Sequence, residues 1–145
     1  MRNRQEILDN LYEAFSGYAQ HTPFSCDHCH PKEWQEYFVE TNLSEISGDH
    51  AYSIVTEVSD HWHNSRVYRH YLPRILELMG KPYFIDTLSP ENIFGRLTEM
   101  DFMNWSQSEK TVVLQFLEIL DNELPFEIAE EREEWEVRYR QFKCT

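Results

Sequence analysis

Four side chains that could bind a metal fall within five consecutive positions near the N-terminus: Cys26, His28, Cys29 and His30. The Cys-x-x-Cys spacing of Cys26 and Cys29 lets two thiolates reach one zinc ion. Either His28 or His30 could supply a third ligand, because adjacent residues of a tight turn rarely all point at one ion. A fourth ligand would have to come from another segment, where the candidates are His21, His61 and His63.

The same loop has two further interpretations, because the second half of a zinc motif is missing. A redox-active Cys-x-x-Cys pair needs its first cysteine at the start of a helix that follows a strand, and no such pattern surrounds Cys26. The third interpretation is a polar loop with two reduced thiols, one or both of them buried. Three cysteines, with Cys144 beside the C-terminus, argue against a disulfide framework.

Other polar clusters each allow a functional and a structural interpretation. Arg69, His70 and Arg74 could bind an anion, or they could form a solvated face paired with nearby glutamates. The histidines of His61-Trp62-His63 could chelate a metal, or they could interact with the dipole at the end of a helix.

An acidic run near the C-terminus is the candidate partner-binding surface. Its carboxylates are those of Glu130, Glu131, Glu133, Glu134 and Glu136. They indicate either a docking surface for a basic partner or a solvated helix face.

The net charge and the composition of the chain exclude several classes of function. The 145 residues include 26 acidic and 13 basic side chains, for a net charge of −13. This charge repels nucleic acids and anionic membrane surfaces, and it favours a basic protein partner. No apolar run approaches the ~20 residues of a membrane span. No apolar stretch follows the N-terminal charges as in a signal peptide, so we expect a cytoplasmic protein.

Apolar residues recur at helical spacing along most of the chain, and no segment alternates in the manner of a strand. We predict an all-α fold of about six or seven mostly antiparallel helices in a single domain covering residues 1–145. The expected helices are 3–16, a short one opened by Pro31, 47–60, 68–79, 89–100, 106–124 and 127–142.

Several residues mark where these helices begin and end. Ser106-Gln107-Ser108-Glu109 is a capping box, and Ser47 is a predicted N-cap. Gly17 occupies the position of a residue just after a helix. Pro73 interrupts the best apolar stripe, so it either kinks that helix or begins a new one.

Three stretches together resemble a widespread family of bacterial cytosolic proteins that has no assigned activity. They are Leu11–Phe15 leading into the cysteine loop, Tyr68–Leu78 with its aromatic-Leu-Pro-Arg-Ile-Leu-Glu-Leu pattern, and Leu97–Trp105 leading into the Ser106 helix. The resemblance covers about residues 8–122 and implies an all-helical fold with a Cys-rich loop after the first helix. The family loop is Cys-x-Cys-Cys, and His28 stands where the family has its middle cysteine. His61-Trp62-His63 departs from the family's Thr-Trp-Gly.

These patterns support three hypotheses of function. The first is a non-catalytic acidic binding protein that acts through protein–protein interaction, for example an immunity or antitoxin-type protein that neutralises a basic toxin or nuclease. The alternative is a zinc-binding protein with a structural or hydrolytic site at Cys26 and Cys29. The third is a small-molecule enzyme that uses paired carboxylates, although no spacing singles out a pair.

Overall fold

The computed structural model describes residues 3–18, 32–61, 65–79, 90–123 and 129–143 of the chain. Within these ranges the chain forms seven α-helices and no strand, which confirms the predicted all-α fold. The α-helices are α1 (Arg4–Ala14), α2 (Lys32–Glu40), α3 (Gly48–His61), α4 (Ser65–Met79), α5 (Pro90–Glu99), α6 (Gln107–Glu123) and α7 (Ala129–Lys143). The described segments between them also contain two short 3-10 helices, η1 (Leu43–Glu45) and η3 (Phe102–Asn104).

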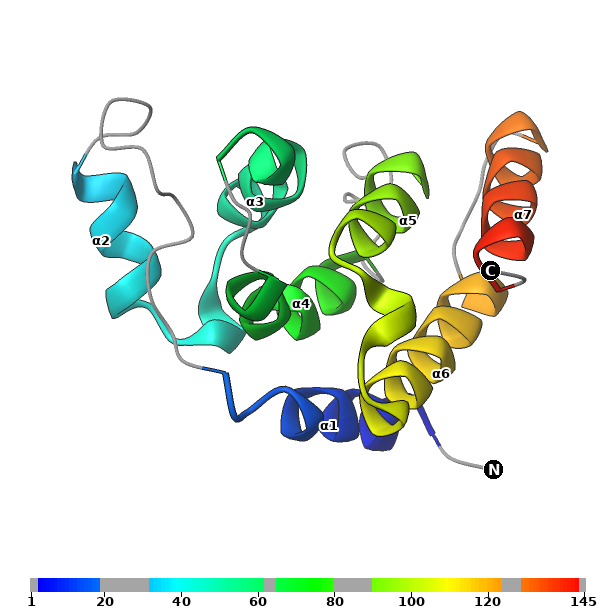
Figure 1. Ribbon diagram of the computed structural model, residues 1–145, viewed down its shortest axis with the longest axis horizontal. Coiled ribbons are helices and arrows are strands. Elements are labelled where there is room, and N and C mark those ends of the chain that lie inside the picture. Colours follow the sequence, from blue (N-terminus) through cyan, green and yellow to red (C-terminus); the bar gives the residue numbers. More distant parts are fainter. Residues whose placement is uncertain (1–2, 19–31, 62–64, 80–89, 124–128, 144–145) are drawn as a thin grey trace.

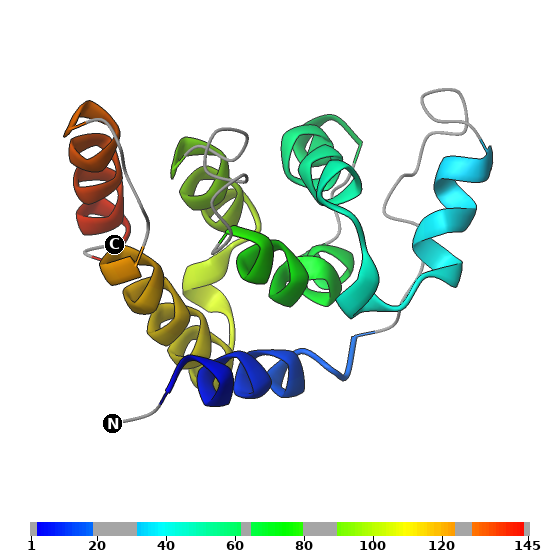
Figure 2. The same ribbon diagram turned by 180° about the vertical axis from the view of Figure 1, so that it is seen from behind.

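The helices form a fan around α4. In Figure 1, α2, α3, α5 and α7 follow one another across the molecule, while α1 and α6 run beneath them. The reverse view in Figure 2 shows the same order, with α2 and α7 at opposite ends. The chain contacts agree: α1 packs on α6 and α4, α3 packs on α4 and α5, and α5 packs on α7.

Helix α4 is the centre of the hydrophobic core. Ten of its fifteen residues are buried, and they lie around most of its circumference, as expected for a helix enclosed by others. Tyr68, Tyr71 and Leu72 are 0 to 1 % exposed. Trp135 of α7 and Phe116 of α6 extend the same core toward the last two helices.

The predicted helix starts are formed by the expected side chains. Ser106 and Glu109 make the reciprocal capping box, with the Ser106 amide donating to Glu109 Oε1 (3.2 Å) and the Glu109 amide donating to Ser106 Oγ (3.3 Å). Ser47 Oγ accepts from the His50 amide at the start of α3 (3.3 Å). Asn3 also caps α1 by accepting from the Glu6 amide (2.8 Å), although this cap was not among those predicted.

Three local predictions need correction. Helix α1 ends at Ala14 with Phe15 as its C-cap, and Gly17 does not adopt a positive φ. Helix α4 runs through Pro73, so the alternative in which a new helix begins there is wrong. The ~3 kcal/mol cost of an internal proline is offset by burial of the residues around it. Helix α3 runs from Gly48 to His61, one residue later at each end than the expected 47–60.

Asp101 takes the left-handed conformation that ends the α5 segment, with φ 63°. Asp tolerates this conformation better than most residues. Among the described helices, none combines the length and apolar composition that crossing a bilayer requires.

Candidate functional site

The cysteine and histidine loop lies outside the described residues. This applies to Cys26, His28, Cys29 and His30, and to the side chains of His21, His61 and His63. In the part of the chain that the structure describes, no three His, Cys, Asp or Glu side chains gather in a way that could hold a metal ion. Zinc binding by the loop therefore stays a prediction.

Arg69 is bound on several sides by residues of its own chain. Its Nη1 donates to the Tyr18 hydroxyl (2.8 Å) and lies 3.5 Å from Glu109 Oε1. Nη2 donates to Ser65 Oγ (3.3 Å), and the guanidinium lies 4.4 Å from the Trp105 ring centroid. The Arg69 guanidinium thus connects α4 to the start of α6.

Tyr18 connects this cluster to the end of the first helical segment. Its hydroxyl donates a short hydrogen bond to Glu109, and its carbonyl accepts from Nδ1 of the buried His70 (3.0 Å). Desolvation first, and then the hydrogen bond to Glu109, raise the pKa of Tyr18. The residue that precedes the undescribed 19–31 segment is therefore fixed to both α4 and α6.

Arg74 forms a second tether on the opposite side of α4. Its Nη1 pairs with Glu77 (2.8 Å), and its Nε donates to the Ile46 carbonyl (2.9 Å). Glu77 also accepts from the Tyr12 hydroxyl of α1 (2.6 Å). The expected pairing of Arg69 and Arg74 with glutamates is confirmed, and the two arginine side chains are only 18 % and 15 % exposed, so this face is less solvated than expected.

Three more arginines pair with acids of the chain. Arg4 pairs with Glu123 and thereby connects α1 to α6. Arg96 pairs with Glu99 (3.0 Å), and its Nε donates to the Val55 carbonyl of α3 (2.8 Å). Arg132 of α7 lies 3.4 Å from Asp121 of α6. These arginine side chains consequently connect neighbouring helices.

The exposed surface of the described residues is strongly acidic. The exposed basic side chains of the described residues are only Arg66, Arg138, Arg140 and Lys143. The exposed acidic side chains of the same residues are Glu6, Asp9, Glu13, Glu33, Glu36, Glu40, Glu45, Asp49, Glu99, Asp101, Glu118, Glu123, Glu133, Glu134 and Glu136. Among the side chains that the structure describes, exposed acids thus outnumber exposed bases by nearly four to one; the full sequence has two acids for each base.

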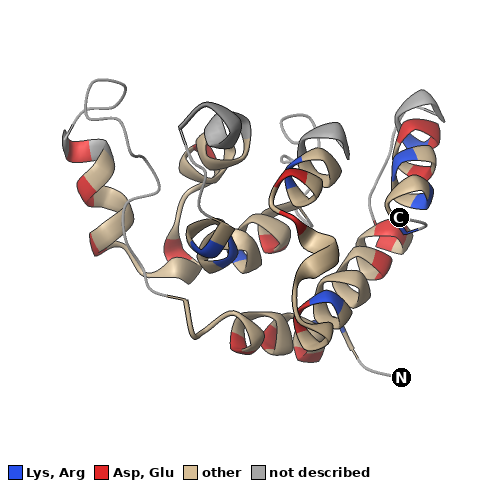
Figure 3. Cartoon of the chain, in the orientation of Figure 1, with Lys and Arg blue, Asp and Glu red and all other residues tan. Residues whose placement is uncertain are grey.

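Two acidic stripes account for the most regular part of this surface. Helix α1 presents Glu6, Asp9 and Glu13, and helix α2 presents Glu33, Glu36 and Glu40, all exposed. Both sets have i, i+3, i+7 spacing, which places the side chains on one face of each helix. Figure 3 shows acidic positions repeating along both helices. The spacing is visible in the sequence, but these stripes were not among the predicted sites.

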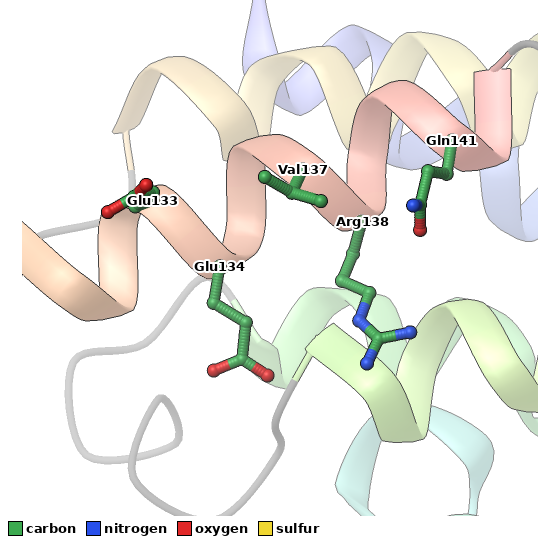
Figure 4. Close-up of a pocket in the computed structure, with 5 residues that line it drawn as sticks. All are labelled: Glu133, Glu134, Val137, Arg138 and Gln141. Carbon is green, nitrogen blue, oxygen red and sulfur yellow. The ribbon is translucent and has the colours of Figure 1, made fainter.

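Helix α7 carries the predicted acidic site. Glu133 and Glu134 are exposed as expected, whereas the side chains of Glu130 and Glu131 lie outside the described set. With Val137, Arg138 and Gln141, the two glutamates line a shallow open hollow of about 530 Å³. In Figure 4, Val137 lies between the acidic pair and Gln141. The hollow could receive a partner side chain, with an apolar centre and charges around it.

No family model matches the chain, and the comparisons with curated proteins and with solved structures give no match. Function must therefore be argued from the surface itself.

Proposed function

We propose that the chain is a non-catalytic acidic helical protein that binds a basic protein partner through its outer acidic surface, as immunity and antitoxin-type proteins do. The observation that carries this proposal is the separation of charge. Five arginines pair with acids of the chain, and Arg69, Arg74 and Arg96 among them are only 15 to 18 % exposed, while acids remain on the exposed faces of α1, α2 and α7. A surface of one sign accelerates the encounter with a partner of the opposite sign.

The placement of acids at helix ends supports binding as their role. Negative charge is unfavourable near the C-terminus of a helix because it meets the negative end of the helix dipole. Nevertheless, Glu13 lies in the last turn of α1 and Glu40 ends α2, and neither last turn contains a basic residue. Like charges at i, i+3 and i+4 add a further cost. Acidic residues at positions where they destabilise the helices are consistent with a surface whose role is to bind a partner.

The experiment is affinity capture with the full chain, followed by identification of the captured proteins. We expect a basic protein that is retained at physiological salt and released as salt rises. Reversing the stripes with Asp9→Lys/Glu13→Lys or Glu36→Lys/Glu40→Lys should weaken its binding by about tenfold or more. Recovery of only acidic partners, or of none, at physiological salt would reject the proposal.

A control separates the stripes from total charge. Glu45→Lys/Glu118→Lys, on η1 and α6, changes the net charge by the same amount at exposed positions outside the stripes. We expect this variant to bind more tightly than either stripe variant. An equal loss in all three variants would show that net charge acts without a localised surface.

Zinc binding is the second candidate function, and it rests on the Cys-x-x-Cys spacing of Cys26 and Cys29. Elemental analysis of protein purified without added metal tests it. About one equivalent of zinc, together with a fall in melting temperature after chelation, would support a structural site. Zinc near zero, with melting unchanged by chelator, would remove this candidate.

A further inference from the structure

The exposed charges of α7 divide the helix into an acidic half and a basic half. Glu133 and Glu134 precede Val137, whereas Arg138 and Arg140 follow it. All four charged side chains are exposed, and none forms an ion pair with another described residue. Val137 itself is 43 % exposed, which makes it an apolar centre between charges of opposite sign.

Helical geometry places a continuous stripe on the outer face of α7. The inner face is fixed by Trp135 and Tyr139, which are 1 % and 5 % exposed and pack against α5. At 100° per residue, Glu133, Val137 and Arg140 lie on the side of the helix opposite these two aromatic residues. From the N-terminal to the C-terminal end, this outward stripe consists of an acidic residue, Glu133, an apolar residue, Val137, and a basic residue, Arg140.

We propose that this stripe is a self-association surface that takes a second copy of the chain, with the two α7 helices antiparallel about a two-fold axis at Val137. In that arrangement Arg140 of each copy lies opposite Glu133 of the other. On the neighbouring flank, Glu134 of each copy faces Arg138 of the other. A two-fold contact requires a surface that complements itself, and an acidic half followed by a basic half meets this requirement.

The chemistry also sets the strength of the contact. The two Val137 side chains form the apolar centre, and the four ion pairs form a polar rim. One helix face from each copy buries less than about 1,200 Å² in total, which is the size of weak interfaces. The charge of −13 on each chain opposes the approach of a second copy. The dimer is consequently weak and concentration-dependent, and it goes beyond the proposed binding of a basic partner.

Sedimentation velocity of the full chain over a concentration series tests the proposal. Wild type should shift from monomer toward dimer as concentration rises. Glu133→Arg and Arg140→Glu should each stay monomeric, because each one places like charges opposite one another. An equimolar mixture of these two variants should dimerise, since every Arg of one variant then faces a Glu of the other. Circular dichroism of each variant confirms that the helices are retained.

The control is Glu45→Arg on η1, which changes the charge by the same amount at an exposed position outside α7 and outside the acidic stripes. It should dimerise at least as well as wild type, because it lowers the repulsion between copies. Net charge alone would make Glu133→Arg associate more strongly than wild type, whereas pairing through α7 makes it associate less. A wild-type chain that stays monomeric at all concentrations, or a mixed sample that does not associate, would overturn the proposal.

Discussion

Glu109 combines two tasks at the start of α6. One carboxylate oxygen accepts from the Ser106 amide, and the same carboxylate receives the Tyr18 hydroxyl and the charge of Arg69. The residue is buried, so its charge is stabilised by these groups instead of by water. The surrounding Trp105 ring and Tyr18 exclude solvent from the pair. Removal of the Glu109 charge should therefore destabilise the whole fold.

Glu109→Gln should lower the free energy of unfolding by about 2–3 kcal/mol, because a partly buried Arg69 loses its counter-charge. The amide keeps the shape of the capping box, so the loss reports mainly the ion pair. Urea denaturation measures the effect. Glu118→Gln, an exposed change on the same helix, should alter stability by less than about 0.5 kcal/mol. Equal effects of the two changes would show that the Arg69 pair contributes little.

Buried tyrosines should make the fold sensitive to alkali. Burial, with further contributions from Glu118 and Asp121, raises the pKa of Tyr139 from 10.0 to about 12. The unfolded chain loses this proton near pH 10 while the folded chain keeps it, so stability is lost as pH rises from 10 toward 12. Tyr139→Phe should reduce the fall in the urea midpoint over that interval, whereas Tyr52→Phe at an exposed site should not. An unchanged slope in Tyr139→Phe would contradict this assignment.

At the scale of the helices, polar tethers determine which elements lie together. The Arg74 and Glu77 pair connects α4 to α1 and to Ile46 at the end of η1, and Arg132 with Asp121 connects α6 to α7. Asp121 also accepts from the Trp135 indole (2.8 Å). Apolar burial supplies most of the stability, and these directional contacts select one arrangement of helices.

Helix α2 provides a matched test of the cost of its acidic stripe. Glu40→Lys at the C-terminal end should raise the free energy of unfolding by about 0.3–1 kcal/mol, because a cation suits that end of the dipole. Glu33→Lys in the first turn should lower it by a similar amount, for the same reason. Thermal and urea denaturation at low salt measure both changes. Effects of the same sign in both variants would contradict the dipole argument.

Helix positions follow from local signals, which is why they could be predicted. The Ser106 box, the Ser47 cap and the proline at the start of α5 all specify helix ends within a few residues of themselves. The partners of Arg69 and Arg74 could not be predicted in this way, because Glu109 and Ile46 are distant in sequence.

The face of α7 that is exposed to solvent was predictable, because Trp135, Tyr139 and Phe142 recur at helical spacing on the buried face. The acidic stripes of α1 and α2 were predictable from their spacing and were missed.

At the scale of the whole molecule, the exposed charge of the described residues is mostly negative. Five arginines are paired with acids at contacts between or along helices, and the exposed surface of the described residues is dominated by carboxylates. Repulsion among these carboxylates should destabilise the fold at low ionic strength. We therefore expect the melting temperature to rise between about 0.01 and 0.3 M monovalent salt, where the screening length falls from ~30 Å to less than 8 Å. A melting temperature that falls over this range would show that the internal ion pairs outweigh surface repulsion.

The most direct test of the central claim is the association rate constant between the chain and its captured basic partner, measured by stopped flow as salt is raised. Steering by the acidic surface predicts that the rate falls by about tenfold or more between 0.02 and 0.5 M salt. It also predicts that Asp9→Lys/Glu13→Lys/Glu36→Lys/Glu40→Lys removes most of this dependence. A rate that is insensitive to salt, and unchanged by reversal of both stripes, would contradict an acidic surface built for binding.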